Sequence, residues 1–134
     1  MVPVTAHYDT VPSAYKDQYT AYVDNKSGVP VIDKAVMDTF FEAAAVDSND
    51  PKVFATLSKN LSEFPPTYIA TCGKDPLRDD GKILGAMLER EQVKVKHDFW
   101  EGVPHYFWLF PGLKMGREFL DGVANGVKFV LGDK

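Results

Sequence analysis

Two β-prone runs separated by one helical stretch constrain the fold of this chain more than any other feature. Residues 67–72 (TYIATC) form a short run bounded by prolines and a glycine, which is typical of a buried parallel strand, and residues 93–100 alternate as a second strand. Residues 77–92, between them, place apolar side chains along one helical face. The pattern predicts a βαβ unit, whose right-handed crossover sets the two strands parallel and side by side.

The remaining segments predict further elements around this unit. Asp33 is suited to cap a helix whose apolar spacing ends at Ala44, and residues 113–131 predict a closing helix. The inward positions expected in the closing helix are Phe119, Leu120, Val123, Val127, Val130 and Leu131. Residues 2–5 predict a short strand, which reads as the tail of a strand that has lost its upstream context. We therefore expect an α/β fold of about three mainly parallel strands flanked by helices, as a single domain over residues 1–134.

Composition and charge exclude several classes of partner. The net charge is −4, and the fifteen lysines and arginines are scattered, which argues against binding to nucleic acid or to an anionic membrane. No apolar run approaches the length of a membrane span. Cys72 is the only cysteine and Met1 begins no secretion-signal pattern, so we expect no intramolecular disulfide and a cytoplasmic location. A small neutral or amphipathic ligand fits this composition better.

A carboxylate and a histidine follow the two predicted strands. Asp75 comes just after the first strand, and His105 comes just after the second. Because the carboxyl ends of neighbouring parallel strands meet at one edge of a sheet, we expect the two side chains to lie within hydrogen-bond distance. A carboxylate that accepts the imidazole Nδ1–H fixes the tautomer and leaves Nε2 as a base. The sequence therefore predicts a catalytic dyad of Asp75 and His105.

The other titratable residues give weaker signals. His7 and His97 have no spaced partner, so a structural role is expected for each. No group of histidine, cysteine and carboxylate residues has metal-ligand spacing, and we expect neither a metal nor another cofactor. Cys72 lies in the strand that precedes Asp75, where a small buried thiol is favoured over a nucleophile.

Two motifs carry a resemblance to a known family. The segment D-P-L-R-D-D-G at residues 75–81, followed by V-P-H-Y-F-W at residues 103–108, resembles the acid and base ends of the catalytic triad in the hormone-sensitive-lipase-like branch of the α/β-hydrolases, particularly fungal carboxylesterases and lipases. The resemblance implies a truncated α/β-hydrolase fold. Within it, residues 65–134 are expected as a βαβ-α segment that carries the Asp and His loops, and residues 7–64 as an irregular and helical cap-like segment.

The nucleophile-bearing part of that family's pattern is absent from the printed sequence. Family members place their catalytic groups in the chain order Ser, Asp or Glu, His, with the serine in a G-x-S-x-G turn and an HGGG-type oxyanion loop before it. Neither motif occurs here, and no serine has a glycine two residues before it. The serines are Ser13, Ser27, Ser48, Ser58 and Ser62. The resemblance thus implies the C-terminal half of such an enzyme.

Three aromatic residues are predicted to contact a substrate. Tyr106 stands where bacterial members of the family usually have glycine and fungal members often have a larger residue, and Trp108 belongs to the apolar run after His105. Tyr8 lies in the tyrosine-rich start of the cap-like segment, which the resemblance directs toward the substrate entrance. The alternative is that these side chains only pack within the domain, since aromatic bodies with polar tips are common at half-buried sites.

The predicted function follows from the Asp75–His105 dyad and from the lack of a nucleophile motif in the printed sequence. We expect an esterase-derived enzyme in which His105, oriented by Asp75, performs a non-hydrolytic step on an apolar metabolite, such as isomerisation, elimination, hydration or cyclisation. The resemblance suggests fungal natural-product metabolism as the setting. The alternatives are a non-catalytic binding or partner subunit and a fragment that completes a serine hydrolase supplied in trans. An open sheet edge also predicts a partner, either a second copy in a homodimer or a complementary hydrolase half.

Overall fold

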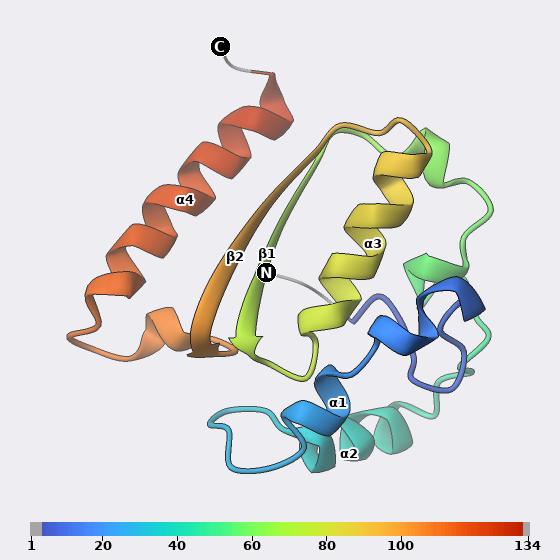
Figure 1. Ribbon diagram of the computed structural model, residues 1–134, viewed down its shortest axis with the longest axis horizontal. Helices are drawn as coiled ribbons and strands as arrows, with labels where there is room; N and C mark the ends of the chain where they lie inside the picture. Colours follow the sequence, from blue (N-terminus) through green and yellow to red (C-terminus); the bar gives the residue numbers. More distant parts are fainter. Residues whose placement is uncertain (1–3, 133–134) are drawn as a thin grey trace.

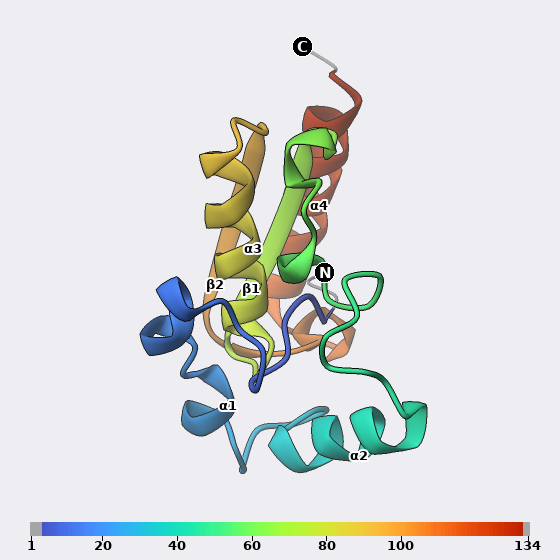
Figure 2. The same cartoon turned by 90° about the vertical axis from the view of Figure 1, so that its right-hand side faces the viewer.

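Two parallel strands lie between two helices in the computed structural model, which describes residues 4–132 (Figure 1). Short 3₁₀ turns and the helices α1 and α2 precede the strands, and both views place α1 and α2 beyond the strands' carboxyl ends (Figures 1 and 2). The helices and strands are α1 (Ala21–Asp24), α2 (Lys34–Ala44), β1 (Thr67–Lys74), α3 (Arg78–Arg90), β2 (Val95–Pro104) and α4 (Lys114–Leu131). The expected α/β architecture of parallel strands flanked by helices is confirmed, with two strands in the described residues where about three were expected.

The predicted βαβ unit is confirmed. β1 pairs with β2 in parallel, from Thr67 opposite Val95 to Cys72 opposite Trp100. Side chains alternate along β1, so that Ile69 faces α3 and Tyr68 faces α4. The two helices therefore pack on opposite faces of β1, while Phe99 of β2 remains 48% exposed.

β2 extends further than its sequence pattern indicates, because the pairing contains an irregularity. The register shifts after Cys72, so that Lys74 lies opposite Pro104. Gly102 adopts a φ of 73°, and a Cβ at Gly73 would lie 2.8 Å from the Gly102 nitrogen. The missing side chain at Gly73 allows the two backbones to approach closely, and the extra residues in β2 carry the chain to His105 beside the end of β1.

The predicted strand at residues 2–5 is not found where the structure describes it. Residues 2 and 3 lie outside the described residues, and Val4 and Thr5 are in no strand. The amide of Thr5 donates to Asp80 Oδ1 at 2.9 Å, and its carbonyl accepts from both the amide and the hydroxyl of Thr56. These bonds replace strand pairing, and within residues 4–132 the sheet has two strands.

The predicted inward face of α4 is only partly correct. Phe119 is buried, but Leu120, Val127 and Leu131 are 58%, 50% and 71% exposed. The reason is that α4 has a narrow sheet beneath it. The apolar side chains that line shallow depressions along α4, beside Tyr68 of β1 and beside the η4 turn, form what we call the apolar flank: Leu120, Val123, Val127, Val130 and Leu131. Beside β2, the depression along α4 is lined instead by charged residues, including Lys96, Asp98 and Asp121.

The core is divided into three clusters of buried side chains. One joins α1 and α2 to Leu77, one fills the space beneath α3, and one lies between the sheet, the η4 turn (Phe107–Leu109) and α4. Helix α2 begins as expected, with Asp33 accepting the Val36 amide at 3.1 Å, although Phe40 is 54% exposed. No helix among residues 4–132 is long and apolar enough to cross a membrane.

Candidate active site

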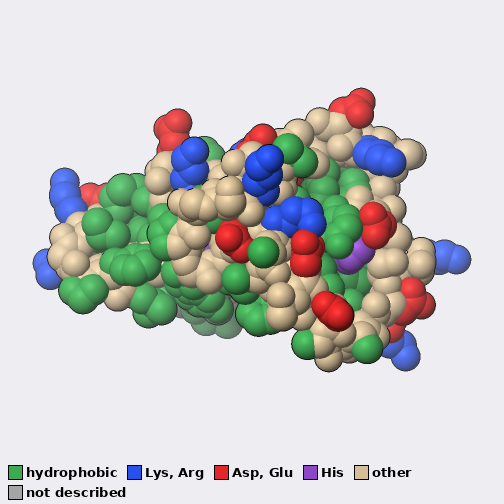
Figure 3. Space-filling view, turned by 90° about the horizontal axis from the view of Figure 1, so that it is seen from below, with side chains coloured by type: hydrophobic (Ala, Val, Ile, Leu, Met, Phe, Trp, Pro, Cys, Tyr) green, Lys and Arg blue, Asp and Glu red, His purple; other side chains and the backbone are tan. Residues whose placement is uncertain are grey.

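Asp75 and His105 meet at the carboxyl end of the sheet. Asp75 directly follows β1, His105 directly follows β2, and the distance from Asp75 Oδ2 to His105 Nδ1 is 2.6 Å. Both residues are buried, with exposed fractions of 2% and 6%. The expected proximity of the two side chains is confirmed. In the view from below, hydrophobic side chains gather toward α4 and charged ones toward the centre and the opposite side (Figure 3).

Each oxygen of the Asp75 carboxylate has a separate partner. Oδ1 accepts the amide of Leu77 at 2.8 Å, and Oδ2 faces the imidazole. The Asp75 carbonyl accepts the amide of Arg78 at 3.0 Å, which begins α3. Since a carboxylate opposite Nδ1 accepts a hydrogen bond from Nδ1–H, the arrangement favours the tautomer in which Nε2 is basic. The contacts therefore fix the orientation of the carboxylate and of the imidazole.

Aromatic rings surround one side of His105. Tyr106 meets the imidazole edge to face with ring centres 4.2 Å apart, and its backbone is left-handed, with φ 59° and ψ 21°. Trp108 lies 5.2 Å from the Tyr106 ring and stacks on Phe119 at 4.2 Å. Tyr106, Trp108, Phe119 and neighbouring aliphatic side chains line a depression of about 360 Å³. Two of the three predicted substrate residues thus lie together beside the histidine.

Tyr8 lies in a different part of the molecule. Its ring contacts His7 and Tyr22 at centroid distances of 4.2 and 5.5 Å, and Lys34 Nζ lies 5.1 Å above it. It packs against the buried cluster of α1 and α2 and is not among the residues that line the depression beside Tyr106. The structure does not bring Tyr8 together with the other two.

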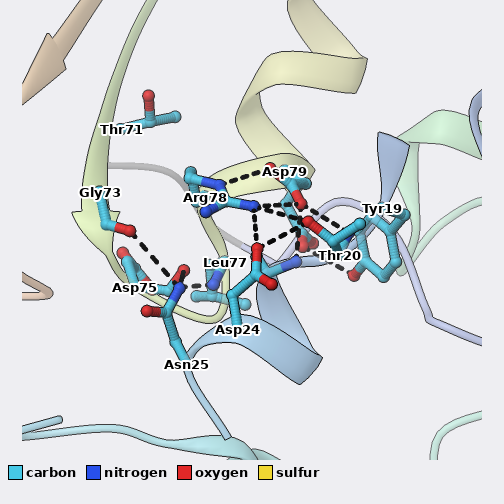
Figure 4. A network of polar contacts seen from close by, with 12 residues as sticks. Tyr19, Thr20, Asp24, Asn25, Thr71, Gly73, Asp75, Leu77, Arg78 and Asp79 are labelled. Carbon is cyan, nitrogen blue, oxygen red and sulfur yellow. Dashed lines mark hydrogen bonds and ion pairs between the residues drawn. The ribbon is translucent and has the colours of Figure 1, made fainter. Parts of the chain in front are cut away.

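The acidic residues of the D-P-L-R-D-D-G motif anchor the cap-like segment. Asp79 is buried, and its Oδ2 accepts the amides of Thr20 and Ala21 at 2.8 and 2.7 Å (Figure 4). Arg78 binds the same carboxylate through two nitrogens, at 2.7 and 3.0 Å. The sequence motif predicts a role for Asp75 alone, because the partners that Asp79 anchors lie 58 and 59 residues away and leave no local signal.

Asp80 makes a second set of anchoring bonds. Its Oδ1 accepts the amides of Thr5 and Ala6, and its Oδ2 accepts the Tyr19 hydroxyl at 2.8 Å. Burial raises the pKa of Asp80 to about 7, although the three donors favour its charged form. Burial also raises the pKa of the Tyr19 hydroxyl, which therefore stays protonated as a donor.

The surroundings of Cys72, His97 and His7 favour structural roles for these three residues. Burial raises the pKa of the Cys72 thiol to about 12, which disfavours the thiolate that a nucleophile requires. His97 Nε2 lies 2.7 Å from the Thr71 hydroxyl across the sheet, and His7 is buried among aromatic rings. Among residues 4–132 no group of three or more His, Cys, Asp or Glu side chains is arranged to hold a metal ion.

Comparison with known proteins identifies the family. A sequence model described as the alpha/beta hydrolase fold matches residues 3–109. The versiconal hemiacetal acetate esterase of Dothistroma septosporum is 45% identical over 132 residues, which is 98% of this chain and 40% of the esterase. The enzyme of the same name from Aspergillus parasiticus is 36% identical, with 97% of this chain and 42% of that protein covered.

A solved structure agrees with the sequence relatives. The crystal structure of vibralactone cyclase has 28% sequence identity and a TM-score of 0.91, and the match covers 98% of this chain and 38% of that one. The chain thus spans about 40% of the length of the two curated esterases that it resembles. With the fold, the positions of Asp75 and His105 and the family match in agreement, this chain belongs to the α/β-hydrolase family.

Proposed function

We propose that this chain performs acid–base chemistry on a small apolar molecule, with His105 as the proton-transfer group and Asp75 as its orienting partner. The observation that carries the proposal is the 2.6 Å contact between Asp75 Oδ2 and His105 Nδ1, because it sets Nε2 as the basic nitrogen. The depression lined by Tyr106, Trp108 and Phe119 supports an apolar substrate, and its link to the dyad is the Tyr106 ring, which contacts the imidazole of His105.

The proposed chemistry needs no covalent intermediate. His105 Nε2 removes a proton from an activated C–H or O–H group, and the imidazolium returns it at another position or to a leaving group, as in isomerisation, elimination, hydration or cyclisation. A positioned base contributes about two to four orders of magnitude in rate. The likeness to vibralactone cyclase supports cyclisation as one member of this class.

Proton abstraction by His105 can be tested without knowing the natural substrate. The probe is 5-nitrobenzisoxazole, an apolar compound that opens on loss of one proton and gives a coloured product. We expect the wild-type protein to exceed buffer, His105→Ala to lose the excess, and Asp75→Asn to lose most of it because the imidazole takes the wrong tautomer. His97→Ala is the matched control, since His97 is exposed and lies in β2. A His105→Ala protein that folds by circular dichroism and keeps the full rate would reject the proposal.

A second candidate function follows from the share of the relatives that the chain covers. Two esterase relatives extend well beyond it, the chain covering 40% and 42% of them, and no G-x-S-x-G turn occurs in the printed sequence. On this proposal Asp75 and His105 complete a serine esterase whose nucleophile lies in residues outside the sequence. The edge of β1 away from β2 and the apolar flank of α4 are the surfaces on which such a half, or a second copy in a homodimer, would pack. A non-catalytic binding role remains the outcome if neither activity is found.

A further inference from the structure

A buried asparagine from the cap-like segment contacts the loop that carries Asp75. Asn25 is 2% exposed, and its Nδ2 donates to the Asp75 carbonyl at 3.1 Å and approaches the Gly73 carbonyl at 3.5 Å (Figure 4). Fifty residues separate Asn25 from Asp75 in the sequence. A buried amide without partners is costly, so these contacts fix the side chain of Asn25 and the two carbonyls together.

The backbone around Asn25 is held from the opposite direction. Asn25 follows α1, whose amino end is bound by Asp79 through the amides of Thr20 and Ala21. Arg78 also forms an ion pair with Asp24, with a distance of 2.9 Å between Arg78 Nη2 and Asp24 Oδ2. The Arg78 side chain is 17% exposed. Asn25 therefore stands between two fixed points, the first turn of α3 and the end of β1, as the close view shows (Figure 4).

The Asp75 carbonyl has two hydrogen-bond donors among the described residues, the Arg78 amide and Asn25 Nδ2. Pro76 has no amide proton, and the Asp75 carbonyl is otherwise bound only by the Arg78 amide among the described backbone hydrogen bonds. Rotation of the peptide that follows Asp75 would move the Leu77 amide away from Oδ1, and that bond orients the carboxylate whose Oδ2 faces His105. The amide of Asn25 opposes that rotation directly at the carbonyl.

We propose that Asn25 is a positioning residue for the Asp75–His105 dyad, acting through the backbone of the acid loop. The cap-like segment then has a role in the chemistry that is separate from any contact with substrate, because it supplies the group that holds the carboxylate toward Nδ1. The catalytic part of this inference rests on the proposed function of His105, whereas the geometric part does not.

The test removes the amide and follows the imidazole itself. In Asn25→Ala and in the nearly isosteric Asn25→Asp, the low-field proton resonance of His105 Nδ1–H is expected to shift or broaden, and the benzisoxazole rate to fall about tenfold or more, since misplacement on the ångström scale has effects of this size. Assignment is simple, because the protein has three histidines and His105→Ala removes the signal. Asn49→Ala is the matched control, as Asn49 is exposed and its side chain contacts only Asp47 among the described hydrogen bonds.

The readouts separate the possible failures. If both folded Asn25 variants keep the wild-type resonance and rate while only their thermal stability falls, the residue is merely structural and the inference is overturned. If the resonance changes but His105→Ala never affected the rate, the positioning role stands and the proposed function fails. Asn25→Asp keeps the volume of the side chain, so it provides the measurement if Asn25→Ala does not fold.

Discussion

Tyr106 has a backbone conformation that residues other than glycine rarely adopt. Its φ of 59° places it in the left-handed region, where an L-residue is disfavoured by about 1–2 kcal/mol. The residue stands directly beside the imidazole, with its ring 4.2 Å from that of His105. Because the ring packs directly against the imidazole, we predict that Tyr106 contacts a bound ligand.

Substitution of Tyr106 should separate strain from binding. Tyr106→Gly is expected to have a free energy of unfolding higher than that of Tyr106→Ala by about 1 kcal/mol, because only glycine relieves the left-handed conformation. Both variants should bind an apolar probe such as naphthalene more weakly than wild type, followed by Trp108 fluorescence in a Trp100→Phe background. Urea unfolding measures the first quantity. Equal stabilities of the two variants would contradict the assigned strain.

At the residue scale the sequence reveals the dyad but not its supports. Asp75 and His105 are predictable because each follows a recognisable strand, and parallel pairing of these strands brings the two side chains to the same edge of the sheet. Asn25, Asp79 and Asp80 find their partners 48 to 75 residues away, in loops without a periodic pattern. No local rule predicts such contacts, because they depend on how the cap-like segment packs.

Gly126 of α4 is unfavourable for helix formation but is required for packing against β1. Glycine lowers helix propensity by about 1 kcal/mol relative to alanine, so a weakened helix is the natural expectation. Gly126 is nevertheless buried, and a Cβ built there would overlap ring carbons of Tyr68. The absent side chain lets α4 pack on the tyrosine of β1, whose hydroxyl donates to Asp98 at 2.8 Å.

The change Gly126→Ala should therefore destabilise the protein despite the better helix former. We expect the free energy of unfolding to fall by about 1–3 kcal/mol, the usual consequence of overpacking a filled site. Asn125→Ala, at the exposed neighbouring position, should be neutral or slightly stabilising. Urea unfolding of both variants gives the comparison, and a stabilised Gly126→Ala would show that Tyr68 moves aside freely.

At the element scale the periodic segments are predictable and the irregular ones are not. The spacing of apolar residues places α2, α3 and α4 within a few residues of their observed bounds. Val4 and Thr5 are β-prone, but their backbone partners are the Asp80 carboxylate and Thr56, so propensity is overridden by tertiary contacts. The apolar spacing of α4 predicts burial correctly for Phe119 but not for Leu120, Val127 and Leu131, which the two-stranded sheet leaves exposed.

The whole molecule has one apolar and one polar side along α4. Val127, Val130 and Leu131 lie beside Tyr68 of β1, whereas Lys96, Asp98 and Asp121 line the side of β2. A strand edge with an adjacent apolar surface is a site for association. The polar side beside β2 is suited to solvent. The asymmetry supports a partner that continues the sheet from β1.

Co-expression tests that partner. When co-expressed with the upstream part of the Dothistroma septosporum esterase, the chain should hydrolyse p-nitrophenyl butyrate, and His105→Ala should prevent this hydrolysis. The isolated chain should give no burst of product, because no acyl-enzyme can form. Val127→Glu together with Leu131→Glu should abolish the complementation by placing charge on the apolar flank, away from the depression beside Tyr106. Asn125→Glu, exposed in the same helix, should not. Light scattering of the isolated chain gives its own association state, and a monomer would argue against the homodimer.

The division of the core into three clusters bears on the cooperativity of unfolding. The clusters beneath α3 and α4 share the sheet, whereas the buried cluster of α1 and α2 takes only Leu77 from the βαβ unit, and its other links are the hydrogen bonds of Asn25, Arg78, Asp79 and Asp80. Segments with few buried apolar contacts to their neighbours open at lower free energy than the global transition. When α1 and α2 open, Asn25 leaves the acid loop while β1 and β2 stay paired. Mild denaturant should therefore disturb the orientation of His105 by Asp75 at concentrations that leave the sheet folded.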